Sequence, residues 1–199
     1  MSLDHLLDLA VSAAIAAGNF LNEKKLEKKE IFKEDGRDIK LIIDQDTEKL
    51  IRSSLRATNI PILGEEYGGE FSEERYWVID PIDGTANYFR GLDECCISIA
   101  LMEGNDALIG VVFNFNNNQM YTASKNGGAF LNDKRITVSN VSSRDKASIT
   151  TGFPASESID SSLQFLEDLK GWRKVRMFGS AALSCAYVAS GKCDYYAEK

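Results

Sequence analysis

Two aspartates at the end of an apolar segment could together bind a metal ion. Asp80 and Asp83 lie in the stretch YWVIDPIDGTANYFRG, separated by a proline and an isoleucine. Pro81 favours an extended backbone at Asp80, and a tight turn after it can bring both carboxylates to one point. The carbonyl of Ile82 can face the same point. Because Mg²⁺ prefers oxygen ligands of these kinds, the turn predicts a magnesium site.

Electrostatic repulsion between the two side chains favours the same interpretation. Two carboxylates about 4 Å apart repel by roughly 4 kcal/mol at an effective dielectric constant of about 20, which corresponds to about three pKa units. A divalent cation removes this conflict, and Glu65 in the upstream ILGEE segment can reach the same cation. Gly84 lets a ligand approach the backbone, and Thr85 adds a hydroxyl. From repulsion alone, we expect Asp83→Asn to leave the metal-free protein at least as stable as the parent.

The composition is that of an ordinary globular protein. Of the 199 residues, 44% are hydrophobic and 27% are charged, which is enough chain for one sizeable core or two small ones. The formal net charge is −7, and we expect the basic run KKLEKK, residues 24–29, on a solvated helix face. Nucleic acid is not an expected partner, because its binding needs a clustered cationic surface. Metal ions would let an acidic protein bind a phosphorylated substrate.

The apolar run near the N-terminus predicts an amphipathic helix rather than a signal peptide or a membrane span. Residues 6–21 follow an acidic start and are interrupted by Asp8 and Asn19. A membrane span would need about 20 apolar residues. The apolar side chains share one helical face, formed by Leu3, Leu6, Leu7, Ala10, Ala14, Ala17 and Leu21. We therefore expect no membrane partner and a cytoplasmic location.

Cysteine and histidine usage argues against several kinds of site. The spacing of Cys95, Cys96, Cys185 and Cys193 matches no zinc motif, and we expect buried, reduced thiols. Cys95 and Cys96 are adjacent in an expected strand, so they should point to opposite faces. The sole histidine, His5, is expected at the surface. A Ser–His–Asp or Cys–His mechanism is therefore not expected.

The order of the expected elements predicts an α/β protein. Helices are expected over 4–28 and 44–58, with Asp44 as the N-cap of the second. Strands at 60–63 and 76–80 should precede an antiparallel meander over 96–102, 107–115, 119–124 and a hairpin within 126–139. Strand, helix, strand, helix and strand should then follow over 146–153, 156–171, 172–178, 179–191 and 192–198. We place a boundary near residue 140, between a metal- and phosphate-binding α+β domain, 1–140, and the start of a second α/β domain, 141–199.

At this point the sequence resembles the inositol monophosphatase family of Mg²⁺-dependent, lithium-sensitive phosphatases. The motifs that carry the resemblance are ILGEE and WVIDPIDGTANYFRG, supported by Lys33, by DIKLIIDQDTE and by FGSAALSCAYVASGKCDYYAE near the C-terminus. Together they cover essentially the whole chain. The resemblance implies a layered sandwich of alternating α-β-α-β-α layers, a homodimer, and hydrolysis of small phosphate monoesters of the inositol 1-phosphate type.

The resemblance also implies a role for each matching residue. Two or three Mg²⁺ ions would be held by Glu65, Asp80, the carbonyl of Ile82 and Asp83. Gly84 and Thr85 would bind the phosphate. The catalytic set would be Glu65, Thr85, Asp44 and Lys33: Glu65 and Thr85 would position a metal-bound water for in-line attack, Asp44 would hold the Thr85 hydroxyl, and Lys33 would sit beside the site. The alcohol half of the substrate would face Gly179, Ser180, Ala181 and Glu198.

Two departures from the family pattern leave alternatives open. Leu92-Asp93 stands near where the family usually has an aromatic–proline pair, which leaves the fit of that loop open. The family also has a Trp-Asp pair, its Asp a further metal ligand, about seven residues past the position of Glu198, whereas this sequence ends at Lys199. We therefore expect a fragment that lacks its C-terminal part, or a naturally short relative with a defective site.

Other functions remain compatible with the same residues. A fructose-1,6-bisphosphatase or a 3′-phosphoadenosine-5′-phosphate phosphatase of the same superfamily is an alternative substrate class. A catalytically defective metal-binding or interaction module is an alternative without catalysis. The haloacid-dehalogenase phosphatases fit less well, because their two aspartates are separated by one residue, and Asp80 and Asp83 are separated by two.

Overall fold

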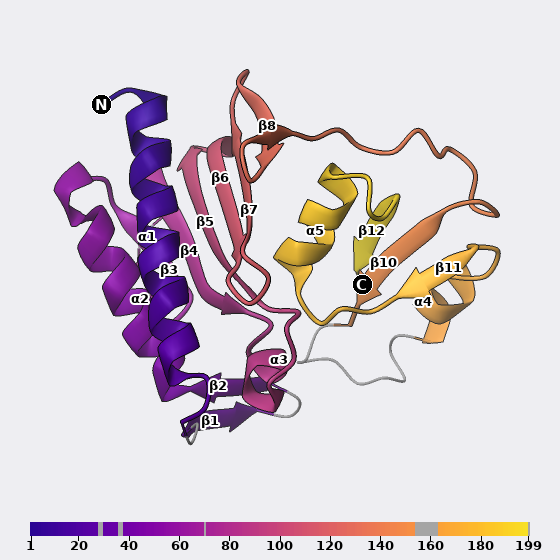
Figure 1. Cartoon of the computed structure of the whole chain (residues 1–199), viewed down its shortest axis with the longest axis horizontal. Helices are drawn as coiled ribbons and strands as arrows, with labels where there is room; N and C mark the ends of the chain where they lie inside the picture. The colour runs from indigo at the N-terminus through magenta and orange to yellow at the C-terminus, as the bar shows by residue number, and fades with distance from the viewer. Residues whose placement is uncertain (28–29, 36–37, 70, 154–162, 199) are drawn as a thin grey trace.

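A computed structural model describes residues 1–27, 30–35, 38–69, 71–153 and 163–198 (Figure 1). Its centre is a seven-stranded sheet in the order β3-β4-β5-β6-β7-β8-β9. β3 runs parallel to β4 and every later pair is antiparallel, which confirms the predicted meander. The strands are β3 (Ile62–Gly64), β4 (Arg75–Asp83), β5 (Cys96–Glu103), β6 (Asp106–Asn114), β7 (Gln119–Ser124), β8 (Gly128–Leu131) and β9 (Lys134–Arg135).

Two helices, α1 (Leu3–Lys24) and α2 (Ile42–Leu55), cover one face of this sheet (Figure 1). The predicted apolar face of α1 is confirmed, since it supplies buried core residues that include Leu6, Ala10, Ala14, Ala17 and Leu21. Gly18 permits the close approach of α1 to the sheet, because a Cβ there would lie 2.7 Å from the Phe113 ring. None of the helices in the described part of the chain combines the length and apolar character needed to cross a membrane.

The opposite face of the large sheet is covered by α5 (Ala181–Ala189), which separates it from a second, smaller sheet (Figure 1). This three-stranded parallel sheet has the order β11-β10-β12, with β10 (Ser148–Gly152), β11 (Lys174–Arg176) and β12 (Tyr195–Glu198). Figure 1 shows α4 (Leu163–Asp168) at the far end, beside β11. The succession of helices, sheet, helix and sheet confirms the predicted mixed α/β class.

Several local predictions differ from the structure near α2. A hairpin of β1 (Ile31–Asp35) and β2 (Asp38–Leu41) stands where only a break at Gly36 was expected. α2 begins at Ile42, so Asp44 lies within its first turn rather than at the N-cap, and it accepts a hydrogen bond from the Leu41 amide at 2.6 Å. The predicted helix over 44–58 ends as an α-helix at Leu55 and continues as the short 3₁₀ helix η1 (Arg56–Thr58). The short helix α3 (Thr85–Arg90) was not predicted. Of the helix expected over 156–171, residues 154–162 lie outside the described part of the chain.

The cysteines largely follow their predicted placement. Cys95 packs in the core beneath α1 and α2, whereas Cys96 packs with residues of α5, so the two thiols do point to opposite faces. All four cysteines are free, and burial raises the pKa of Cys95 to about 12. Cys185 is exposed, contrary to the expectation of four buried thiols, because the buried face of α5 is formed by Leu183, Ser184 and Ala186 instead. His5 is exposed, as expected.

Candidate active site

The turn that follows β4 is shaped by its own side chains. The pairing of β4 with β5 is interrupted between Asp80 and Asp83, where the strand bulges around Pro81. The carboxylate of Asp80 accepts a hydrogen bond from the Ile82 amide at 3.0 Å, and the Thr85 hydroxyl donates to the Ile82 carbonyl at 3.0 Å. Such short-range bonds fold an Asp-Pro segment into a defined turn.

Glu65 lies beside Asp80, as the sequence predicted. Gly64 of β3 pairs with Ile79 of β4, and the Glu65 amide donates to the Ile79 carbonyl at 3.2 Å. Glu65 and Asp80, which follow these two residues in the chain, therefore lie next to each other. The half-buried Asp80 has a pKa well above its usual range. Burial is the largest cause, followed by the negative charges of Glu65 and Asp83 and by a hydrogen bond to Glu65. The structure therefore brings two acids together at a point where their charges conflict.

Asp83 makes contacts that the sequence did not reveal. Its Oδ2 accepts from the Ser180 hydroxyl at 2.5 Å and from the Ala182 amide at 2.7 Å, and its Oδ1 accepts from the Ala181 amide at 3.2 Å. These donors lie at the N-terminus of α5, where a negative charge is stabilised by the free amides and the helix dipole. The expectation that Asp83→Asn leaves metal-free stability intact considered repulsion alone, and these three donors reverse the expected sign.

The donor set fits a hard divalent cation, although the described side chains do not form a complete cage. Within the described residues, no group of three or more His, Cys, Asp or Glu side chains is arranged as a metal site. However, burial and then the charges of Glu65 and Asp83 raise the pKa of Asp80, and a cation at this place would relieve both effects. A carboxylate has about four acceptor positions, so Asp83 can accept from α5 and still offer a lone pair. Oxygen ligands alone favour Mg²⁺ over softer metals.

The other predicted catalytic and phosphate-binding residues lie in different settings. The Thr85 hydroxyl has one proton, which it donates to Ile82, so in this arrangement it does not donate to Asp44 as the resemblance implied. Gly84 adopts φ +92°, and a Cβ there would lie 2.9 Å from the Glu94 carbonyl and 3.1 Å from that of Gly179. The glycine at position 84 therefore allows these two backbone carbonyls to pack closely against it. The Lys33 side chain lies outside the described part of the structure.

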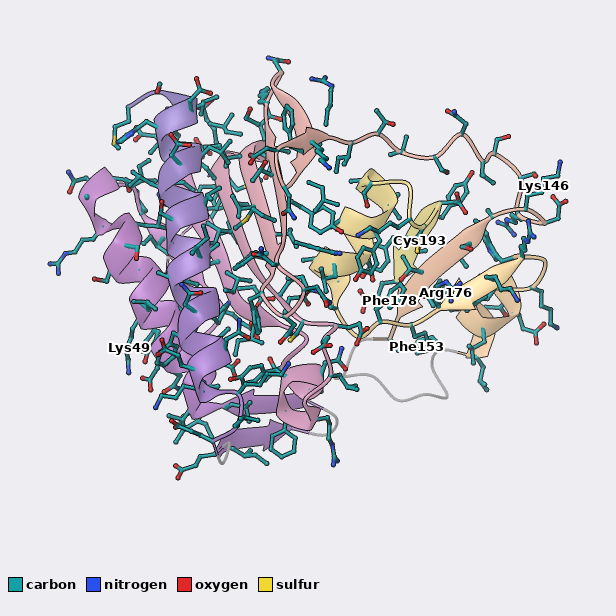
Figure 2. The ribbon with its side chains drawn as sticks, viewed as in Figure 1. Lys49, Lys146, Phe153, Arg176, Phe178 and Cys193 are labelled. Carbon is teal, nitrogen blue, oxygen red and sulfur yellow. The ribbon has the colours of Figure 1, made fainter. Side chains whose placement is uncertain are left out.

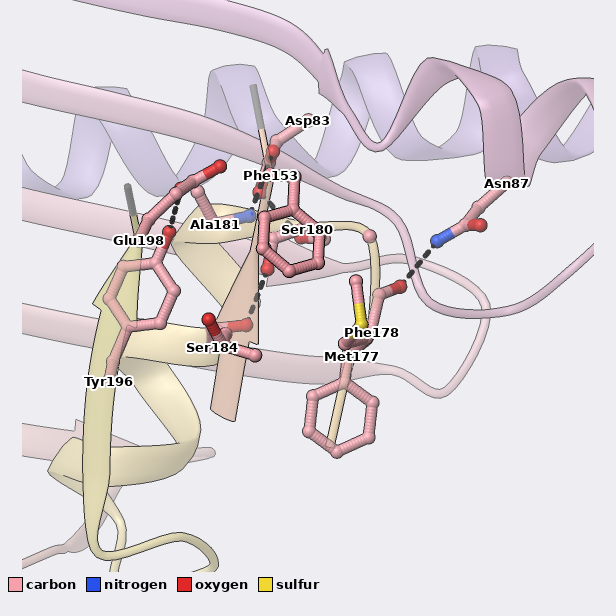
Figure 3. Close-up of a pocket in the computed structure, with 13 residues that line it drawn as sticks. Asp83, Asn87, Phe153, Met177, Phe178, Ser180, Ala181, Ser184, Tyr196 and Glu198 are labelled. Atoms are coloured by element: carbon pink, nitrogen blue, oxygen red, sulfur yellow. Dashed lines mark hydrogen bonds between the residues drawn. The ribbon is translucent and has the colours of Figure 1, made fainter. Parts of the chain in front are cut away.

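A pocket of about 420 Å³ opens next to Asp83 (Figure 3). It brings together all four residues that were expected to face the alcohol half of the substrate. Its lining is Asp83, Asn87, Thr151, Gly152, Phe153, Met177, Phe178, Gly179, Ser180, Ala181, Ser184, Tyr196 and Glu198. In the described part of the chain, Glu65, Asp80 and Thr85 do not belong to this lining. Ser180 is buried and gives its hydroxyl to Asp83, so it supports the wall rather than presenting a free hydroxyl.

Sequence reasoning missed several residues of this pocket. The Asn87 amide donates to the carbonyls of Glu94 and Phe178, both at 2.7 Å, and so ties the turn after β4 to the loop before α5. Tyr196 donates its hydroxyl to Glu198 (Figure 3). Thr151 is buried, and its hydroxyl has no hydrogen-bond partner among the described groups. In the sequence, Thr151 could have been recognised as a candidate site residue from its position near the end of an expected strand.

Comparison with known proteins agrees with this geometry. The sequence pattern of the inositol monophosphatase family matches residues 2–199. A protein named Nus factor SuhB from Xylella fastidiosa is 37% identical, in an alignment covering 96% of this chain and 72% of the relative. A fructose-1,6-bisphosphatase/inositol-1-monophosphatase from Thermotoga maritima is also 37% identical, over 86% of this chain and 64% of the relative.

A solved structure supports the same assignment. The extragenic suppressor protein suhB from Bartonella henselae superimposes with a TM-score of 0.91 at 30% identity, covering 98% of this chain and 78% of that one. The agreement extends over both sheets, since it includes nearly every residue of the chain. This chain therefore belongs to the inositol monophosphatase family.

Proposed function

We propose that this chain hydrolyses small phosphate monoesters of the inositol 1-phosphate type with the help of Mg²⁺. The observation that carries the proposal is the pocket that continues from Asp83, because it sets a space for a small organic group directly beside the acidic turn. The proposal is supported by family membership and by relatives named as inositol-1-monophosphatases. Among these, the protein of Rhizobium meliloti is 31% identical to this chain.

The proposed metal ligands are Glu65, Asp80, the Ile82 carbonyl and Asp83, holding two or three Mg²⁺ ions. The inositol monophosphatase family is metal-dependent, and the charge conflict at Asp80 supports a cation at this place. When bound, Mg²⁺ supplies Lewis-acid chemistry: it makes a water more acidic and offsets negative charge on phosphoryl oxygens. The protein's own part is to hold the acids at the end of β4 and to fix the turn through the Ile82 and Thr85 hydrogen bonds.

Hydrolysis would proceed by a single displacement at phosphorus. A water oxygen forms the new bond to phosphorus, the bond from phosphorus to the alcohol oxygen breaks, and the alcohol leaves with a proton that the water provided. Glu65 is the proposed acceptor of the water proton, and Gly84 and Thr85 are the proposed phosphate contacts at the start of α3. Asp44 and Lys33 are kept as proposed catalytic neighbours.

The proposed place for the alcohol is the pocket between α3, α5 and β12. Gly179 and Ala181 form part of one wall, where they add little side-chain bulk, and Glu198 offers a carboxylate to hydroxyl groups at another (Figure 3). The pocket lining is mixed, with aromatic side chains such as Phe153 beside polar groups. A ring that carries several hydroxyl groups would match such a lining, because its faces are apolar and its rim is polar.

The proposed partner is a small phosphorylated sugar or cyclitol, bound by a cytoplasmic homodimer without membrane or nucleic acid. The net charge of −7 speaks against a nucleic-acid surface. Two further substrates stay open within the same chemistry. Fructose 1,6-bisphosphate is suggested by the name of a relative, and 3′-phosphoadenosine 5′-phosphate by the sequence resemblance alone. The relative from Thermotoga maritima carries both a fructose-1,6-bisphosphatase and an inositol-1-monophosphatase name.

The proposal is tested by measuring phosphate release from a panel of three substrates: inositol 1-phosphate, fructose 1,6-bisphosphate and 3′-phosphoadenosine 5′-phosphate. We expect Mg²⁺-dependent turnover of at least one of them, with inhibition by lithium. Excess chelator should abolish the activity and readdition of Mg²⁺ should restore it. Undiminished turnover in chelator would overturn the mechanism. Mg²⁺ binding without turnover would favour the alternative of a metal-binding module.

Thr151→Val is expected to weaken substrate binding without destabilising the protein. Thr151 lines the pocket, and its buried hydroxyl has no partner among the described groups, so we expect it to gain a hydrogen bond only when a bound substrate reaches it. One hydrogen bond of about 1 kcal/mol corresponds to a several-fold increase in KM. The matched control is Thr150→Val. The buried Thr150 hydroxyl forms a hydrogen bond with Ser184 at 3.1 Å, so its removal should destabilise the folded protein. An unchanged KM for Thr151→Val, with a loss of stability like that of the control, would remove Thr151 from the site.

A further inference from the structure

The loop that carries Glu65 is held by a buried carboxylate on α2. Glu48 is fully buried, with 0% of the residue exposed. Its Oε2 accepts the amide of Glu66 at 2.6 Å, and its Oε1 accepts the amide of Tyr67 at 3.3 Å. These two amides directly follow Glu65. The backbone that places Glu65 therefore depends on the Glu48 side chain.

Arg52, one helical turn after Glu48, completes the clamp. Its Nε donates to Glu48 Oε1 at 2.7 Å. Its guanidinium also donates to the carbonyl of Gly68 at 2.5 Å and to that of Ile62 at 3.4 Å. The arginine thus neutralises the buried carboxylate and binds the backbone on both sides of Glu65. Lys49, the neighbour of Glu48 in sequence, lies instead at the outer edge of the molecule (Figure 2).

Gly64 makes room for this arrangement. A Cβ at Gly64 would lie 2.0 Å from Glu48 Oε1, closer than real Cβ contacts ever come. The Gly64 amide also donates to the Gly68 carbonyl at 2.9 Å, which closes the loop on itself. A glycine is therefore required just before Glu65, because any side chain would displace the carboxylate that holds the loop.

We propose that Glu48 is a positioning residue that fixes the Glu65 carboxylate beside Asp80 for metal binding. The inference rests on the proposed function, in which Glu65 is a metal ligand. A buried ion pair contributes little net stability, since its desolvation costs about as much as its attraction returns. Glu48 instead fixes the position of the loop, because its carboxylate accepts hydrogen bonds from two backbone amides and one guanidinium at once. A glutamine cannot replace it, because its amide nitrogen would face further donors.

The test compares three variants by amide exchange and by Mg²⁺ titration calorimetry, well below their melting temperatures. In the metal-free protein, Glu48→Gln and Gly64→Ala should each lose hydrogen-exchange protection at the amides of Glu66 and Tyr67. Both should weaken Mg²⁺ binding by about 10–100-fold, the usual effect of removing a group that orients a metal ligand. The matched control is Asp46→Asn, which removes one exposed carboxylate from the same helix and should change neither quantity.

The outcomes separate placement from general stability. A merely structural role for Glu48 would lower the melting temperature of Glu48→Gln but leave the Mg²⁺ affinity of the folded protein unchanged, and that result would overturn the proposal. Unchanged exchange at Glu66 and Tyr67 would overturn it as well. If the wild-type chain binds no Mg²⁺ and releases no phosphate, the proposed function fails, whereas the exchange measurement still decides whether Glu48 holds the loop.

Discussion

Asp80→Asn is expected to abolish Mg²⁺-dependent phosphate release and to raise the stability of the metal-free protein. A catalytic metal contributes several kcal/mol of transition-state stabilisation, and each ~1.4 kcal/mol is tenfold in rate, so the loss should reach about 10³-fold. Stability should move the other way because burial and the charges of Glu65 and Asp83 raise the pKa of Asp80. The ionised side chain is thus a cost in the folded state, which the neutral amide removes.

The sign of the pH dependence follows from the same shift. A carboxyl group whose folded-state pKa lies above its ordinary value of 3.8 is stabilising when protonated, and this contribution is lost as the pH rises through the raised pKa. The metal-free parent should therefore lose stability over that range more steeply than Asp80→Asn. Thermal melts in chelator measure the difference, and a rise of about 2–4 °C corresponds to ~1 kcal/mol in a chain of this size. A lower melting temperature for Asp80→Asn would show that the hydrogen bond from the Ile82 amide to the Asp80 carboxylate outweighs the cost of burial and charge repulsion.

Asp83→Asn is expected to abolish the same activity but to destabilise the metal-free protein. The amide loses the charge that faces the N-terminus of α5, and its nitrogen cannot accept from Ser180, Ala181 or Ala182. The loss of a charged helix cap costs about 1–2 kcal/mol, which lowers the melting temperature by about 2–8 °C. The loss of activity should again be about 10³-fold, since a metal ligand is removed.

The matched control for both variants is Asp106→Asn. Asp106 forms an exposed ion pair with Lys125, a type of contact that contributes little to stability. This variant also loses one negative charge, so a general effect of net charge would appear in it. The pair of aspartate variants should move the melting temperature in opposite directions. If both variants shifted the melting temperature in the same direction and by the same amount, the two aspartates would not differ as argued, with Asp80 in a charge conflict and Asp83 capping a helix.

The approach of Glu65 to Asp80 could be predicted from the sequence because it depends on neighbouring strands. Both acids follow short apolar segments, and the ends of two parallel strands meet at one edge of a sheet. The partners of Asp83 could not be found in this way, since Ser180 is 97 residues away in the chain. Which strand end meets which helix end across such a separation is decided by tertiary packing, which leaves no local pattern.

Other differences have local causes. The two strands of the β1–β2 hairpin are short: β1 (IFKED) has no alternation, and β2 (DIKL) alternates over only four residues, so the periodic signal was weak. Asp44 was expected as a helix cap, and it does bind a backbone amide at the start of α2, but from within the first turn. Glu48 lies on the buried face of α2 with Thr47, Ile51 and Leu55, but the sequence does not show which groups its carboxylate meets there, because Glu66 and Tyr67 lie in a separate loop.

The most direct test of the central claim is the position of a bound divalent ion. Crystals of the chain soaked in Mn²⁺, which shares the oxygen-ligand preference of Mg²⁺ and gives an anomalous signal, would locate it. The account predicts an anomalous peak in coordination contact with the carboxylates of Glu65, Asp80 and Asp83, absent in Asp80→Asn. A parent protein that releases phosphate in a Mg²⁺-dependent manner while its Mn²⁺ peak lies away from these three carboxylates would contradict the account.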